Sequence, residues 1–151
     1  MWRLIQNAIQ TLSRVFSASK LESVGENVAD GRPLPEVHFD NLIIVDKTPG
    51  NDVVGAKQFI EVVYKDVPRW AIFKCPCKCG NTISLPLQRP HSPLWKVTES
   101  RAGRPTLHPS VWQKKGCMSH FWIEDGRVFW CRDSGIAPSI ARPDLYSRQK
   151  N

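Results

Sequence analysis

The ten residues FWIEDGRVFW, at positions 121–130, give the clearest structural signal in the sequence. Aromatic and β-branched residues on both sides of Glu-Asp-Gly are typical of two strands joined by a tight turn. We therefore expect a β-hairpin that lays residues 117–121 alongside residues 129–131. The stretch WAIFKCPCKCGNTISLPL, at positions 70–87, predicts a second hairpin with its cysteine-rich centre as the turn. The two hairpins, over residues 70–87 and 117–131, carry all five cysteines.

Outward from the hairpins, the chain continues in short β-like runs separated by Pro and Gly. These runs are VHF at 37–39, NLIIVD at 41–46, QFIEVVY at 58–64 and LWKVT at 94–98. The fold class that they predict is a mostly β domain, small and built of hairpins, over residues 36–151.

The first 35 residues differ from this domain. Apolar side chains spaced by three or four over residues 2–16 predict an amphipathic helix. A polar stretch with Gly25, Gly31, Pro33 and Pro35 follows, which is typical of a linker. We therefore divide the chain into a helix and linker (1–35) and a β domain (36–151). The helix is interpreted as a packing surface for its own domain or a second copy, with docking to a partner or membrane surface as the alternative.

Composition limits the classes of protein that remain. With 41% apolar and 23% charged residues, the 151-residue chain has the make-up of a globular domain, which excludes a disordered or collagen-like chain. No apolar run is long enough to span a membrane, and no secretory signal is evident. We expect a cytoplasmic protein whose cysteines are thiolates and not disulfides. The net charge of +7 fits nucleic acid, an acidic protein or a membrane surface equally well.

The cysteines predict a metal site. Three of them alternate at Cys75, Cys77 and Cys79, and Cys117 and Cys131 follow in the other hairpin. Thiolates from two separate loops are typical of tetrahedral structural zinc, and soft sulfur ligands select zinc or iron over magnesium or calcium. Their clustering argues against five unrelated buried thiols. We therefore expect a structural Zn²⁺ that stabilises the β domain.

Two ligand sets are open. If residues 117–121 are extended, Cys117 and Ser119 face one way and His120 the other. The ligands are then Cys75, Cys77, Cys79 and Cys117, with Cys131 as a neighbour or substitute. If residues 116–120 form a turn, Cys117 and His120 converge on one ion. We prefer the all-cysteine set. His91 and His108 remain substitute ligands.

Two serines and one histidine are candidates for catalysis. A nucleophilic serine needs a base within hydrogen-bonding distance, and the base needs a third group to orient it. Ser119 and His120 point to opposite faces of a regular strand, so Ser110 is the better partner for His120. The competing interpretations are that Ser110 is a turn residue after Pro109 and that His120 binds metal. No acid that orients His120 can be named from the sequence.

Tryptophans interleaved with basic residues allow a different function. Trp70, Trp95, Trp112, Trp122 and Trp130 lie in the β region among arginines and lysines, a composition that suits stacking on single-stranded nucleic acid. Tryptophans more often form the core of a small β domain, and we favour that interpretation.

Three segments together resemble a bacterial family of small cysteine-rich proteins. They are FKCPCKCGNTISLPL (73–87), RPTLHPSVW (104–112) and GCMSHFWIEDGRVFWC (116–131). Members of that family are encoded beside proteins similar to ubiquitin-activating (E1-like) and ubiquitin-conjugating (E2-like) enzymes and beside a ubiquitin-like modifier. Nothing comparable covers residues 1–35.

The resemblance implies a serine-type peptidase that trims the modifier precursor or removes the modifier from its targets. It implies a ubiquitin-like protein or its conjugates as partner. Carried onto this chain, it assigns Ser110, Ser119 and His120 to the chemistry and the four cysteines at 75, 77, 79 and 117 to the metal. The alternatives are a non-catalytic zinc-binding adaptor and, less favoured, a nucleic-acid-binding zinc module.

Overall fold

The computed structural model describes residues 28–29 and 32–146. The amphipathic helix expected over residues 2–16 lies outside these residues. Two units divide the chain, Met1–Leu34 and Pro35–Asn151. In the first unit, β1 (Val28–Ala29) pairs antiparallel with β2 (Arg32–Pro33). All further elements belong to the second unit.

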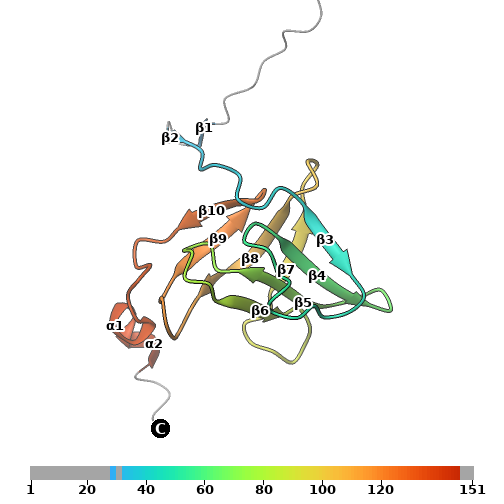
Figure 1. Cartoon of the computed structure of the whole chain (residues 1–151). Helices are drawn as coiled ribbons and strands as arrows, with labels where there is room; N and C mark the ends of the chain where they lie inside the picture. The colour runs from blue at the N-terminus through green and yellow to red at the C-terminus, as the bar shows by residue number, and fades with distance from the viewer. Residues whose placement is uncertain (1–27, 30–31, 147–151) are drawn as a thin grey trace, which may run out of the picture. The chain divides into compact units, whose positions relative to one another are not determined.

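The second unit contains two four-stranded sheets, which Figure 1 shows as two sets of arrows. One sheet has the order β3-β4-β5-β6, and the other has the order β10-β9-β8-β7. All neighbouring strands are antiparallel except β3 and β4, which are parallel. The strands are β3 (Leu42–Val45), β4 (Phe59–Tyr64), β5 (Val67–Lys74), β6 (Thr82–Pro86), β7 (Lys96–Glu99), β8 (Pro105–Trp112), β9 (His120–Glu124) and β10 (Arg127–Trp130).

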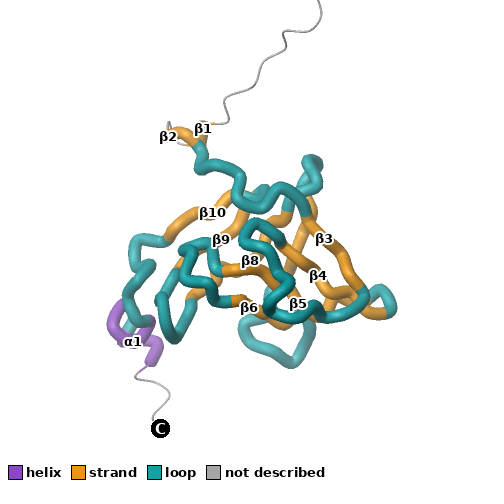
Figure 2. Tube along the Cα trace, viewed as in Figure 1, coloured by secondary structure: helices purple, strands orange, loops and turns teal. Residues whose placement is uncertain are grey.

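Among the described residues, helical structure is confined to two short segments after β10, drawn in purple in Figure 2. These are α1 (Pro138–Ala141) and α2 (Pro143–Tyr146). In the described part of the chain, no helix has the length and apolar character needed to cross a membrane. The prediction of a mostly β domain is therefore confirmed for these residues.

Both predicted hairpins are present. In the β9–β10 hairpin Glu124 pairs with Arg127, which leaves Asp125 and Gly126 as the turn, with φ of 47° and 71°. Asp-Gly is the favoured sequence for a two-residue turn with two positive φ angles. A Cβ on Gly126 would lie 2.1 Å from the carbonyl oxygen of Phe39, so only glycine fits. In the β5–β6 hairpin Lys74 pairs with Thr82 around the cysteine-rich turn.

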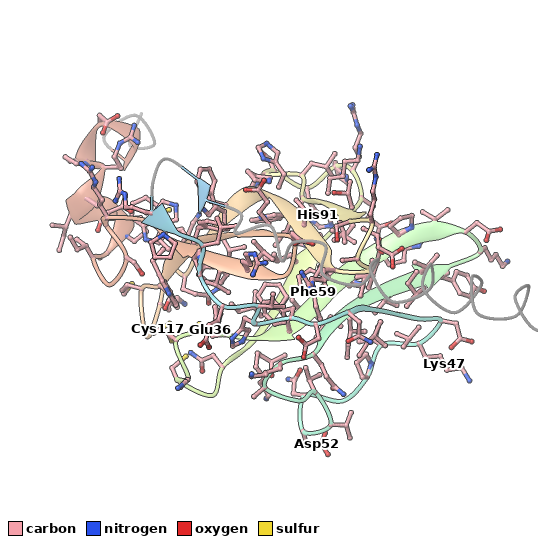
Figure 3. The ribbon with its side chains drawn as sticks, turned by 90° about the horizontal axis from the view of Figure 1, so that it is seen from above. Glu36, Lys47, Asp52, Phe59, His91 and Cys117 are labelled. Carbon is pink, nitrogen blue, oxygen red and sulfur yellow. The ribbon has the colours of Figure 1, made fainter. Side chains whose placement is uncertain are left out.

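The two sheets pack face to face around one aromatic and aliphatic core. Phe73 of β5 contacts Phe121 of β9 across the interface, with ring centroids 6.4 Å apart, and stacks on Phe59 at 4.9 Å. Side chains alternate along β4, so Ile60 points to a second cluster on the other face of its sheet. Figure 3 shows Phe59 inside the molecule, whereas Lys47 and Asp52 of the β3–β4 loop lie at its periphery.

Strand β8 was not among the predicted strands. Prolines at 105 and 109 argue against a central strand because proline cannot donate to the ladder. The structure nevertheless places β8 between β7 and β9, and a register shift between Leu107 and Val111 accommodates Pro109. The interpretation of Ser110 as a turn residue is therefore wrong, because Ser110 lies within this strand.

The tryptophans do not form the core that the sequence led us to favour. None of the five in the β region is among the buried residues, and Trp122 and Trp130 are 54% and 49% exposed. Trp70 and Trp95 are partly buried and pack against the two buried clusters. Phenylalanine supplies most of the aromatic core instead.

Candidate active site and cysteine cluster

Strands β8 and β9 position the two catalytic candidates on one face of their sheet. Trp112 of β8 pairs with His120 of β9, and Val111 pairs with Phe121. Val111 and Phe121 are fully buried between the sheets. Because side chains alternate along a strand, Trp112 and His120 point to the opposite, outer face. Ser110 lies two residues before Trp112 and reaches the same histidine.

Ser110, His120 and Asp133 form a continuous chain of hydrogen bonds. His120 Nε2 lies 3.2 Å from Ser110 Oγ, and His120 Nδ1 lies 2.6 Å from Asp133 Oδ1. Because an ionised carboxylate only accepts, the ring proton belongs on Nδ1, and Nε2 is left to accept from the serine hydroxyl. The side chains of His120 and Asp133 are 14% and 29% exposed, so the site opens to solvent.

Neighbouring groups fix the orientation of the imidazole. The ring of Trp112 stacks on it with centroids 4.2 Å apart and planes only 4° apart. The backbone N–H of His120 donates to Ser134 Oγ at 3.0 Å, and its carbonyl accepts from the N–H of Cys131 at 2.9 Å. These contacts tie the start of β9 to the turn that carries Asp133.

Sequence reasoning missed Asp133. This residue lies beyond β10 in a turn closed by the N–H of Ser134 donating to the carbonyl of Cys131 at 3.1 Å. The signal available in the sequence was the hairpin register, which brings the residues after Trp130 beside His120. Following the predicted hairpin two residues further leads to Asp133, but the hairpin register does not specify the irregular turn that directs its carboxylate to His120.

Ser119 does not join this group. Its hydroxyl donates to Cys117 Sγ at 3.2 Å, and the residue is 2% exposed. Positive φ at Gly116 and Met118 turns the chain before β9 begins. Residues 116–118 therefore form a turn, as one of the two predicted arrangements assumed. The side chains nevertheless point as predicted for an extended segment: Cys117 and Ser119 face the cysteines, and His120 faces Ser110.

Four cysteines converge at the turn between β5 and β6. The sulfur atoms of Cys75, Cys77, Cys79 and Cys117 all lie within 4.8 Å of one another. Cys75 Sγ is 3.3 Å from Cys77 Sγ and 3.8 Å from Cys117 Sγ. Four sulfurs at about 2.3 Å from one tetrahedral zinc would be about 3.8 Å apart, so this donor set fits zinc. Figure 3 labels Cys117, the member contributed by the β8–β9 loop.

The thiols of this cluster differ in pKa. Burial raises the pKa of Cys75, and burial also raises the pKa of Cys79. Burial acts on Cys77 in the same direction, but hydrogen bonds from Ser119 and the neighbouring cysteines outweigh it and lower the pKa of Cys77 to about 6. One thiolate thus forms readily, and binding of a cation would favour deprotonation of the others.

Cys131, the substitute ligand, is not part of the four-cysteine cluster. Its sulfur belongs instead to a group with His120 and Asp133, whose ligand atoms also lie within 4.8 Å of one another. His120, the other substitute, is therefore separated from the four cysteines. The two hairpins create two distinct clusters, one on each side of the start of β9.

A hydroxyl, an imidazole and a carboxylate linked in this order are the arrangement that serine hydrolases use. Comparison with known families agrees with this class. The chain belongs to the bacterial ubiquitination-like system serine protease family (BubE), whose model matches residues 44–131, more than half of the chain. The matched segment contains Ser110, His120 and all five cysteines. The expected link to a bacterial ubiquitin-like system is thereby confirmed. No curated protein and no solved structure matches the sequence.

Proposed function

We propose that this chain is a serine peptidase that cleaves after the C-terminus of a ubiquitin-like modifier, with Ser110 as nucleophile, His120 as base and Asp133 as the orienting acid. The observation that carries the proposal is the hydrogen-bonded order of these three side chains, at 3.2 Å and 2.6 Å. Family membership supports a serine protease of a bacterial ubiquitination-like system.

The mechanism is acyl transfer. Ser110 Oγ attacks the scissile carbonyl carbon while its proton passes to His120 Nε2. Backbone N–H groups near the nucleophile stabilise the resulting oxyanion. The C–N bond then breaks as His120 returns the proton to the leaving amine, which gives an acyl-Ser110 ester and the free amine. Water adds to the ester through the same base, releasing the carboxylate of the modifier and restoring the serine hydroxyl. Asp133 stabilises the imidazolium in both halves of the reaction.

Substrates of this chemistry are the modifier precursor and proteins that carry the modifier. In both, the modifier supplies the acyl group and the leaving group is an amine of the following residue or of a target lysine. Proteins similar to E1 and E2 enzymes would supply the conjugates, because they form the bonds that this reaction hydrolyses.

The cysteine cluster has a structural role in this proposal. Residues 75, 77, 79 and 117 would hold Zn²⁺, which when bound cross-links the β5–β6 turn to the start of β9. Ser119 donates to that cluster and so supports it. The adjacent residue, His120, is left for catalysis.

The decisive experiment compares Ser110→Ala with Ser119→Ala in the full chain. The probes are an activated C-terminal ester of the modifier and a fluorophosphonate that labels reactive serines. We expect Ser110→Ala to lose about 10⁴-fold or more in kcat and all labelling, because the nucleophile is removed. Ser119→Ala should retain both. Loss at Ser119 with activity at Ser110 would overturn the assignment. Wild-type protein that binds the modifier but hydrolyses no ester would favour the adaptor.

A further inference from the structure

A thiol lies beside the proposed catalytic histidine and acid, and the mechanism does not use it. The Cys131 sulfur, one ring nitrogen of His120 and one carboxylate oxygen of Asp133 lie within 4.8 Å of one another. All three residues are half-buried, so their polar atoms remain reachable from solvent. The group is separate from the cluster of four cysteines.

Backbone hydrogen bonds hold these three residues in place. The N–H of Cys131 donates to the carbonyl of His120 at 2.9 Å, which extends the β9–β10 pairing by one step. Cys131 and Ser134 close the turn that contains Asp133, and Ser134 Oγ accepts from the N–H of His120. The fold therefore fixes the backbone from which all three ligand side chains project.

We propose that His120, Cys131 and Asp133 form a second, inhibitory zinc site, through which Zn²⁺ reversibly blocks the protease. This inference rests on the proposed function, since it concerns regulation of the same residues. One imidazole, one thiolate and one carboxylate are the three ligand types that zinc takes in proteins, and the fourth position is left for water. The sulfur donor disfavours magnesium and calcium.

Bound zinc and base catalysis exclude each other at His120. A neutral imidazole has one unprotonated nitrogen, so a ring that gives its lone pair to zinc cannot also accept the Ser110 proton. If zinc binds Nδ1, the ring proton moves to Nε2, which then faces Ser110 as a donor. If zinc binds Nε2, the acceptor itself is occupied. The Cys131 thiol loses its proton to solvent as the sulfur–zinc bond forms.

The geometry requires only a small opening of the site. Nitrogen and oxygen ligands at about 2.0–2.1 Å from a tetrahedral zinc lie about 3.3 Å apart. Nδ1 of His120 and Oδ1 of Asp133 are now 2.6 Å apart. Binding at Nδ1 thus replaces the hydrogen bond by two metal bonds and separates these groups by less than about 1 Å. With one thiolate against four, this site should be weaker than the cysteine cluster and leave first when metal is withdrawn.

Binding can be measured without catalysis. Full-chain Ser110→Ala, with the first metal equivalent retained in the four-cysteine cluster, is titrated with Co²⁺ while thiolate-to-cobalt absorption is recorded. We expect a second equivalent to bind with a new charge-transfer band. Adding Cys131→Ser should remove that band, and adding His120→Ala should weaken binding. A single equivalent, or a band unchanged by both substitutions, would overturn the second site.

Inhibition is then measured on active protein. Added Zn²⁺ should inhibit hydrolysis of the modifier ester, and a mild chelator should restore it. Cys131→Ser should keep the triad but raise the inhibitory zinc concentration by about 10-fold or more, because a principal ligand is lost. Glu124→Gln, which removes an exposed carboxylate from β9, the strand that begins at His120, is the matched control and should leave the inhibition unchanged. Equal zinc sensitivity in Cys131→Ser would refute the proposal.

The outcomes separate this proposal from the proposed function. If Ser110→Ala still hydrolysed the ester, the proposed function would fail, while the cobalt titration would still report on the metal site.

Discussion

Asp133 Oδ1 lies 2.6 Å from Nδ1 of His120, on the side of the ring away from Ser110. The two residues are thirteen positions apart in the chain and meet because the β9–β10 hairpin folds back on itself. This contact defines the tautomer of the histidine and therefore which nitrogen can act as base.

Asp133→Asn should lower kcat for the modifier ester by about 10³- to 10⁴-fold. An amide N–H facing Nδ1 would favour the other tautomer, in which Nε2 carries the proton and cannot accept from Ser110. The substitution is nearly isosteric, so the melting temperature should change little. Asp52→Asn, at an exposed position in the β3–β4 loop, is the control and should leave kcat unchanged. An active Asp133→Asn protein with normal pH dependence would show that another group orients His120.

Trp112→Ala should reduce kcat about 10- to 100-fold with little change in KM. The indole stacks on the His120 ring at 4.2 Å, and without it the imidazole can rotate away from Ser110. Trp112→Phe keeps an aromatic face and should restore most of the rate. The measurement is steady-state hydrolysis by the three proteins, together with their metal content. If alanine and phenylalanine variants behaved alike, stacking would not be what positions the ring.

The sequence allowed the Ser110–His120 pair to be predicted but not its acid. Strand alternation alone separates Ser119 from His120, and that argument needs no knowledge of the fold. Asp133 follows the second strand in an irregular turn, where neither propensity nor periodicity fixes a side chain. Its position depends on hydrogen bonds from Ser134 and Cys131, which only the folded chain reveals.

Local turn chemistry explains why the hairpins were predicted and β8 was not. Asp125 and Gly126 specify their turn through positive φ angles that few other residue pairs adopt. Pro105 and Pro109 carry the opposite local signal, and tertiary pairing with β7 and β9 overrides it through the register shift after Leu107. Strand β8, which contains the proposed nucleophile, is therefore the strand against which local sequence propensities argue.

Asp125→Asn should destabilise the β domain at neutral pH by about 1 kcal/mol or less, since the side chain is about one-third exposed. A hydrogen bond from Ser100 at 2.6 Å, aided by Arg104, lowers the pKa of Asp125. A carboxylate with a lowered pKa stabilises the fold above its ordinary pKa, and this stability is lost as the pH falls through the folded-state value.

The difference in unfolding free energy between Asp125→Asn and wild type should therefore shrink below about pH 4. Asparagine also adopts positive φ, so the turn itself is preserved. Urea unfolding at several pH values measures the effect, and Glu124→Gln is the matched control beside the same turn. A difference that stays constant down to pH 2 would mean that the charge of Asp125 contributes nothing.

Removal of residues 1–30 should leave the β domain folded. The described core belongs to the unit Pro35–Asn151, and the predicted linker separates it from the helix expected over residues 2–16. We expect the melting temperature to change by less than about 4 °C, roughly the shift that 1 kcal/mol produces in a domain of this size. Self-association or partner binding should weaken, as measured by sedimentation. Collapse of the truncated protein on heating at a much lower temperature would place the N-terminal segment in the core.

Metal removal should unfold the β domain, because the four cysteines join its two sheets at one end. Structural zinc contributes an apparent binding free energy of about 10–16 kcal/mol in small modules. This is as large as the whole free energy of unfolding of a typical domain. A strong chelator should therefore abolish the cooperative melt, and Cys79→Ser should lower both zinc content and melting temperature. Cys131→Ser should keep one equivalent of zinc and a near-native melt, since Cys131 lies with His120 and Asp133 and not with the four cysteines. Elemental analysis and thermal melting of the two variants test this distinction. Loss of the structural metal in Cys131→Ser, with retention in Cys79→Ser, would reassign the ligands.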